Sequence, residues 1–340
     1  RLRSFERPES AQEILHPLLR VRVSEVAYLG GIAVVSLGVG AAALFLVPAG
    51  HGGEMSPNAG SSAGAHGAEE GHADGEHAEV GMAASPEDAG VSVEFAAEPA
   101  EPKPDRPVAL SYTVRDAGSG RTITDLPLDH ERPMHTILVS GDLDNFAHIH
   151  PKVQEDGSYR VETTPPDAGT YRLYTEFVRT GEKVLDRREI VVGSSTGGTT
   201  SLTPDLSPKT VEGTTVALDV PETIRAGEPV RLEFKLTREG KPVTDLAPYL
   251  GAAAHVAIVS EDGGDFAHGH GEAEGAAEAA HGDEGPGEGN AEPTHGVPEA
   301  FGPGVHTDHT FEHPGLYKLW AQFSHDGRVI TAPFVVGVRS

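Results

Sequence analysis

No cysteine occurs among the 340 residues of the chain. Without a thiol, the protein cannot contain disulfides, thiolate metal sites, iron–sulfur clusters or a cysteine nucleophile. Basic residues are scarce as well: 26 Lys and Arg stand against 52 Asp and Glu, which gives a formal net charge of −26. The chain therefore lacks the clustered positive charge that binds nucleic acid. We exclude nucleic acid as a partner and expect cations or basic proteins instead.

Motifs of several common catalytic sites are also missing. The sequence has no H-E-x-x-H zinc motif, no P-loop and no glycine-rich dinucleotide-binding motif. Many of its Asp and Glu residues lie in Gly- and Ala-rich stretches, where they are solvated charges rather than paired acids and bases. We predict that the protein is not an enzyme.

An uncharged apolar run extends from Val26 to Val47. As a helix, these residues span roughly 33 Å, enough to cross a bilayer. Positive charge lies on the N-terminal side, at Arg1, Arg3, Arg7, Arg20 and Arg22, and the next basic residue is Lys103. The positive-inside rule then predicts that residues 1–25 are cytoplasmic and that the chain after the helix is not. A cleaved signal peptide is the alternative, but this run exceeds a usual signal core.

We therefore expect a single-pass protein of a bacterial inner membrane, with the lipid bilayer as one partner and basic periplasmic proteins as candidate partners. Small residues recur on the predicted helix: Ser36 with Gly40, and Gly38 with Ala42, form small-xxx-small pairs. Such pairs let another helix approach closely, although Gly and Ala are common in membrane helices generally. The pattern favours packing against another subunit of an inner-membrane complex.

Composition and patterning divide the remaining chain. Residues 48–90 form a spacer rich in His, Gly and Glu, with few large apolar side chains to build a core. Beyond it, runs such as V-S-V-E-F and Y-R-L-Y-T-E-F alternate apolar and polar residues between turn-forming segments, which is typical of antiparallel sandwiches. We predict β-sandwich domains at 91–193 and 213–340, joined by a linker at 194–212. A low-complexity insertion is expected at about 271–305.

The two predicted domains repeat one pattern. At an offset of 120, His135 matches His255 and the phrase 146–150 matches 266–270. After that phrase the offset becomes 146, so that 169–177 matches 315–323, which implies a net insertion of 26 residues in the second copy. The predicted fold class is therefore mainly β: one N-terminal transmembrane helix followed by two tandem antiparallel sandwiches.

Two segments carry a resemblance to known families. D-A-G-T-Y-R-L-Y and H-P-G-L-Y-K-L-W resemble the corner of immunoglobulin-like and cupredoxin-like sandwiches, where a Tyr after a Gly turn bonds back to the backbone. The phrase F-A-H-I-H-P is similar to that of the YtkA-like family of bacterial envelope domains. The resemblance covers about 91–193 and 213–338 and implies the sandwich fold. It also implies an association with metal-handling systems, especially those for copper.

The repeated His-x-His phrase raises a metal-site hypothesis. Residues i and i+2 of a strand share one face, so each phrase presents two imidazoles together, and an earlier strand can add a third. With Asp142 or Asp262 nearby, such a set suits copper or zinc, whereas a blue-copper centre would need cysteine. The alternative is that these side chains only hydrogen-bond backbone carbonyls. The candidate ligands are His135, His148, His150, His255, His268 and His270.

Two functions follow from these observations. In the first, the protein is a non-catalytic accessory subunit that braces a larger membrane complex of respiratory or photosynthetic type through its helix and two sandwiches. In the second, it is a periplasmic copper- or zinc-binding protein that uses the repeated His-x-His phrases. The two are compatible, because a structural subunit can also hold an ion.

Overall fold

The computed structural model describes residues 83–194, 201–273 and 300–340. Every regular element within these ranges is a β-strand, which confirms the mainly β fold class. No helix within them is long and apolar enough to span a bilayer. The predicted helix at 26–47, with Ser36, Gly38, Gly40 and Ala42, lies outside the described residues, as does most of the predicted spacer.

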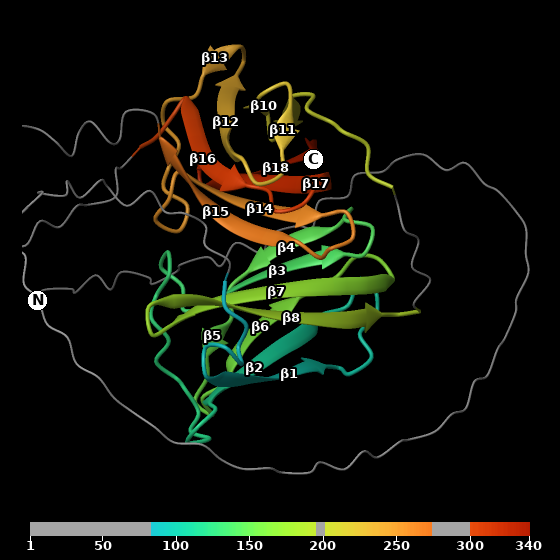
Figure 1. Ribbon diagram of the computed structural model, residues 1–340, viewed down its shortest axis with the longest axis vertical. Helices are drawn as coiled ribbons and strands as arrows, with labels where there is room; N and C mark the ends of the chain where they lie inside the picture. The colour runs from blue at the N-terminus through green and yellow to red at the C-terminus, as the bar shows by residue number, and fades with distance from the viewer. Residues whose placement is uncertain (1–82, 195–200, 274–299) are drawn as a thin grey trace, which may run out of the picture. The chain divides into compact units, whose positions relative to one another are not determined.

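The first half of the described chain consists of two four-stranded antiparallel sheets (Figure 1). One has the order β1-β2-β6-β5 and the other the order β4-β3-β7-β8. The strands are β1 (Val91–Glu98), β2 (Val108–Asp116), β3 (His135–Ser140), β4 (Phe146–Ile149), β5 (Lys152–Val153), β6 (Tyr159–Thr163), β7 (Gly169–Arg179) and β8 (Glu182–Val192).

The second half forms one ten-stranded sheet with the order β11-β18-β17-β14-β15-β16-β12-β10-β9, with β13 added beside β12. Its strands are β9 (Lys209–Val211), β10 (Thr214–Asp219), β11 (Ile224–Arg225), β12 (Pro229–Arg238), β13 (Lys241–Pro242), β14 (Ala254–Ser260), β15 (Phe266–Ala273), β16 (Gly304–Thr310), β17 (Gly315–His325) and β18 (Arg328–Arg339).

The length of β15 explains why the second half has one sheet where the first has two. β15 continues past the His-x-His phrase to Ala273, and its last residues pair with β16 through Glu272↔His306 and Ala273↔Val305. Gly271 permits this approach, because a Cβ there would lie 2.6 Å from Val305 Cγ1. In the first half, β4 stops at Ile149 and the two sheets remain separate.

Some strand residues lie in the stretches that the sequence assigned to the insertion, the linker and the spacer. Strand residues occupy both ends of the stretch assigned to the insertion, because β15 ends at Ala273 and β16 begins at Gly304. β9 lies inside the predicted linker and pairs with β10. Ala84, in the predicted spacer, pairs with Val184. In each case the residues form a strand because they pair with a neighbouring strand, and amino-acid composition does not predict such pairing.

The strand registers repeat at the two offsets read from the sequence. His135 pairs with Glu176 on β7, and His255 pairs with Gln322 on β17. Ser140 pairs with Tyr171, and its counterpart Ser260 pairs with Tyr317. β7 and β17 share length and pairing with the following strand. The two halves therefore have the same order of central strands.

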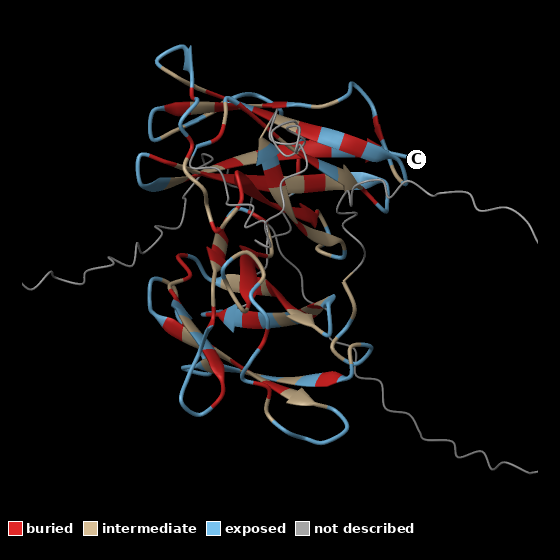
Figure 2. Ribbon diagram, turned by 90° about the vertical axis from the view of Figure 1, so that its left-hand side faces the viewer, coloured by how far each residue is buried: buried red, intermediate tan, exposed pale blue. Residues whose placement is uncertain are grey.

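Each half has its own apolar core, built from the alternation along its strands (Figure 2). Val108, Leu110 and Tyr112 of β2 are fully buried, and the residues between them are partly exposed. The predicted tyrosine corner is confirmed in both halves: Tyr171 donates to Asp167 O at 3.1 Å, and Tyr317 donates to His313 O at 2.8 Å.

β3 and β14 are buried on both faces along their whole length. On β3, Leu138 faces the core of the first half, whereas Ile137 and Val139 belong to a separate apolar cluster. That cluster also contains Ala257 and Val259 of β14. The second faces of β3 and β14 therefore pack where the two halves meet, and His135 and His255 lie on these faces because they are two residues before Ile137 and Ala257.

Candidate metal centre

Four of the six predicted ligands converge where the two halves meet. His135 and His148 come from β3 and β4, and His255 and His268 come from β14 and β15. Each offers one ring nitrogen, and these four nitrogens all lie within 4.8 Å of one another. All four side chains are buried, and both halves belong to one compact unit of the chain. We call this group the four-histidine centre.

Strand pairing positions the two histidines of the first half. β3 and β4 are antiparallel neighbours, and His135 Nδ1 lies 3.1 Å from His148 Nε2. The other nitrogen of each ring has a hydrogen-bond acceptor. His135 Nε2 lies 2.8 Å from Asp129 O, and His148 Nδ1 lies 2.8 Å from Gln322 Oε1.

The second half repeats this arrangement. His255 Nδ1 lies 3.1 Å from His268 Nε2. His255 Nε2 lies 2.9 Å from Tyr249 O, and His268 Nδ1 lies 3.0 Å from Glu176 Oε2. Tyr249 is the counterpart of Asp129 at the offset of 120, and Gln322 is the counterpart of Glu176 at 146. Glu176 and Gln322 each orient a histidine of the opposite half, so neither half completes the group alone.

These contacts determine where the protons lie. A backbone carbonyl only accepts, so His135 and His255 carry their proton on Nε2 and leave a lone pair on Nδ1. Gln322 uses its amide nitrogen toward Thr331 Oγ1 at 3.1 Å, so its oxygen accepts from His148 Nδ1. Above the raised pKa of Glu176, about 7, its carboxylate accepts from His268 Nδ1, so His268 also carries its proton on Nδ1. Four lone pairs then point at one another, which is the donor arrangement that binds a cation.

The four rings could instead be held together by hydrogen bonds from protonated histidines to neutral ones. Burial of the rings opposes this alternative. It lowers the pKa of His135, and it lowers the pKa values of His255 and His268 well below the ordinary range, with the neighbouring histidines adding to the effect. Burial also raises the pKa of Glu176 to about 7. Protonation of these rings is therefore disfavoured. A metal ion could be bound by the neutral rings through their lone pairs, with no ring taking up a proton.

The structure differs from the predicted sites in two respects. We expected a separate site in each domain, whereas the described group takes two histidines from each half. The carboxylates expected from Asp142 and Asp262 are engaged elsewhere, because they accept hydrogen bonds from Ser140 and Ser260 at 2.5 and 2.6 Å.

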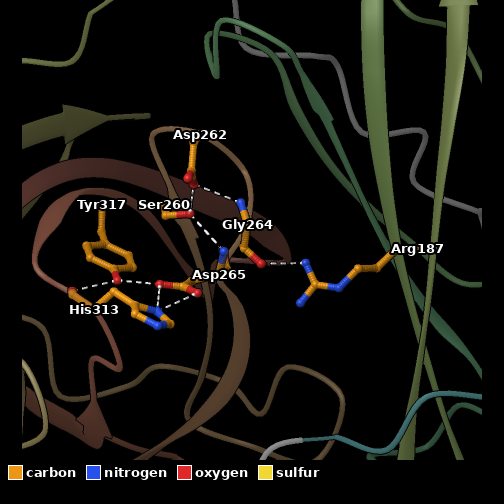
Figure 3. Close-up of polar contacts among 7 residues, drawn as sticks. All are labelled: Arg187, Ser260, Asp262, Gly264, Asp265, His313 and Tyr317. Carbon is orange, nitrogen blue, oxygen red and sulfur yellow. Dashed lines mark hydrogen bonds and ion pairs between the residues drawn. The ribbon is translucent and has the colours of Figure 1, made fainter.

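Asp262 belongs to the turn that leads into β15 (Figure 3). Gly264 N donates to Asp262 Oδ1 at 2.9 Å, and Asp265 N donates to Ser260 Oγ at 2.8 Å. Tyr317 Oη also lies 2.6 Å from Asp265 Oδ2, which ties the turn to the tyrosine corner. Arg187 of the first half donates to Gly264 O at 2.8 Å. The turn thus fixes the start of the strand that carries His268, and it contacts the other half.

Two aromatic stacks pack in the apolar part of the interface between the two halves. Phe146 stacks on Trp320 with ring centroids 4.9 Å apart, and Phe266 stacks on Tyr174 at 4.4 Å. The two stacks are equivalent under the repeat, since each pairs the phenylalanine of one half with an aromatic residue of the other. Phe146 belongs to the apolar cluster between the halves, and Phe266 packs against it.

The remaining predicted ligands, His150 and His270, flank the four-histidine centre. His150 Nε2 lies 3.1 Å from His148 Nε2. The His270 ring lies 4.7 Å from His255 and 5.0 Å from His268. Their proximity to the preceding histidine confirms that residues i and i+2 of each phrase share one face.

Sequence reasoning missed three contributors. Glu176 and Gln322 lie in matched strands at the offset of 146, and that match combined with a polar residue in an otherwise apolar run is a signal that could have found them. His130 lies against His270, with ring centroids 3.4 Å apart. No repeat signal points to His130, because its counterpart at the offset of 120 is Leu250.

Comparison with known families identifies the repeated region. A family model described as "Domain of unknown function (DUF8832)" matches residues 86–192 and 209–340, well over half of the chain. The chain belongs to this family. Every residue of the four-histidine centre, together with Glu176 and Gln322, lies inside the two segments matched to DUF8832.

No curated protein matches the chain. Among solved structures, the Escherichia coli adhesin FdeC shows 16% identity and a TM-score of 0.22 over 74% of this chain and 66% of its own. Yersinia pseudotuberculosis adhesin InvE shows 12% identity and 0.24, over 73% and 60%. Salmonella alpha-2-macroglobulin shows 15% identity and 0.22, over 76% and 15%. The chain thus spans less than two thirds of each of these structures.

Proposed function

We propose that the protein binds one divalent transition-metal ion, zinc or copper(II), between its two β halves. The observation that carries this proposal is the convergence of four buried imidazole nitrogens whose opposite ring nitrogens are held by acceptors. Imidazole is a preferred ligand of zinc and copper, and ligating histidines commonly bond a carbonyl or carboxylate through the second nitrogen. The arrangement matches both features.

The spacing of the nitrogens supports the same assignment. Zinc binds imidazole nitrogen at about 2.0–2.1 Å, so two ligands at a tetrahedral angle lie about 3.3 Å apart. The paired nitrogens of each half lie 3.1 Å apart, close to this value. Four protein ligands would leave no position for a substrate, which is typical of ions that hold a structure together rather than catalyse a reaction. We infer that the ion clamps the two halves to each other.

The bracing of a larger complex and the bacterial inner-membrane location stay predictions. They depend on the helix at 26–47 and its small-residue pairs, which the described residues do not include. Metal binding between the two halves requires neither the membrane helix nor a larger complex, and it is compatible with both. An ion held inside the two halves would stiffen a protein that braces other subunits.

Zinc should stabilise the purified protein against unfolding. Free zinc at about one hundred times its Kd adds roughly 2.7 kcal/mol to the free energy of unfolding of a protein that binds only when folded. For a folded region of this size, that corresponds to a rise in Tm of about 5–10 °C. Differential scanning calorimetry with and without zinc, followed by chelator, measures this rise and its reversal.

Magnesium provides the control for this measurement. It prefers oxygen ligands, so it screens the net charge of −26 without entering an all-imidazole site. If magnesium raises Tm as much as zinc does, the effect of zinc is charge screening and not binding at the four-histidine centre. No rise with either zinc or copper(II) would contradict the proposal.

The charge of Glu176 should strengthen binding of a dication. Glu176→Gln keeps a hydrogen-bond acceptor for His268 and removes the negative charge, so we expect about a tenfold loss of zinc affinity, as for other partners of metal ligands. The repeat supplies a matched control: adding Gln322→Glu to that variant moves the carboxylate to the other half and should restore most of the affinity. Competition with a calibrated chelator measures each Kd. Equal affinities in all three proteins would contradict a role for this charge.

A further inference from the structure

A second group of histidines lies beside the four-histidine centre. His130, His255 and His270 each offer a ring nitrogen, and these nitrogens lie within 4.8 Å of one another. The rings of His130 and His270 are stacked, and the rings of His130 and His255 lie 5.7 Å apart. His255 belongs to both groups, so the two groups share one ligand.

This group connects the interior with the solvent. The side chain of His130 is 30% exposed, whereas His255 is 1% exposed. Between them, His270 Nε2 is buried, and no residue in the described part of the chain forms a hydrogen bond with it. A buried nitrogen without a partner is costly, and a metal ion supplies the missing interaction.

The group breaks the symmetry of the repeat. The position equivalent to His130 in the second half is Leu250, which is buried. Both residues adopt the left-handed backbone conformation, with φ of 46° and 51°, so the two loops match in backbone and differ in side chain. Among the described residues, the loop before β3 therefore offers an imidazole at this position, and the matching loop before β14 offers an apolar side chain instead.

We propose that His130, His255 and His270 form an outer metal site through which the ion enters and leaves the four-histidine centre. This proposal rests on the proposed function. The ion first binds the outer site; it then exchanges His130 and His270 for His135, His148 and His268 while His255 remains bound. The steps exchange neutral nitrogen ligands only and involve no redox change.

His130→Leu tests the proposal, because it places the residue of the second half in the first. Cobalt(II) replaces zinc as the probe, since its visible absorption reports tetrahedral nitrogen coordination. Loading is followed by stopped flow in the full chain, and release is followed after adding excess chelator. We expect both rates to fall by about tenfold, equivalent to roughly 1.4 kcal/mol added to the barrier. Kd and the final spectrum should not change, because the loss of an entry site lowers the rates of metal loading and metal release by the same factor.

His313→Leu is the matched control, because its side chain is 72% exposed and lies outside both groups. It should load and release cobalt(II) as the wild type does. Unchanged rates in His130→Leu would reject the entry site and leave the four-histidine centre intact. A raised Kd in that variant would also reject it, by showing that His130 supports the inner site instead. If the wild-type protein never acquires the tetrahedral spectrum, the proposed function itself is wrong, and the entry site falls with it.

Discussion

The double variant His148→Ala/His268→Ala should lose high-affinity zinc binding. Each substitution removes one ligand from one half, and both target nitrogens lie 3.1 Å from the paired histidine of the same half. Loss of a mere partner of a metal ligand lowers affinity by about 10–100-fold, so loss of two ligands should exceed about a hundredfold. Isothermal titration calorimetry of the full chain measures the affinity and stoichiometry.

The chain contains many other histidines, so the double variant needs a control with the same number of changes. His306→Ala/His313→Ala removes two histidines that belong to neither described group. That variant should retain the high-affinity site and lose only weak, non-stoichiometric binding. Circular dichroism shows whether both variants keep their β structure. Full affinity in a folded His148→Ala/His268→Ala protein would show that the ion binds elsewhere.

Trp320→Ala should destabilise the folded protein by about 3–5 kcal/mol, the usual cost of truncating a large buried aromatic side chain. Trp320 is 3% exposed and stacks on Phe146 of the other half with ring planes 14° apart. The cavity would open between the halves rather than in either core, so zinc affinity should fall together with stability. Urea denaturation of the metal-free protein measures the loss of stability, and chelator competition measures the loss of affinity.

Tyr174→Phe is the milder counterpart at the equivalent stack. It preserves the ring that stacks on Phe266 and removes the hydroxyl that donates to Gly263 O at 2.7 Å. We expect a cost of about 1 kcal/mol, typical of one hydrogen bond. If Trp320→Ala costs no more than this variant, the stacks do not hold the halves together.

The local alternation of apolar and polar residues was sufficient to predict most of the fold. Alternation over short runs predicted strands, since a strand with one face buried places every second side chain inside. The offsets of 120 and 146 predicted the repeat, and the observed registers of His135 with Glu176 and His255 with Gln322 follow them. The same period of two placed His148 with His150 on one face. These features depend on residues near one another in the chain, or on the comparison of one copy with the other.

Only the tertiary structure decided what those faces meet. Period two assigns a side chain to one face of a strand, but it does not say whether a core, solvent or another domain covers that face. β3 and β14 are covered on both faces, so His135 and His255 meet across the two halves instead of completing a site in each. Glu176 and Gln322 reach histidines of the opposite half for the same reason. The sequence by itself determined which imidazoles are presented together, and the packing of the two halves decided that four of them share one centre.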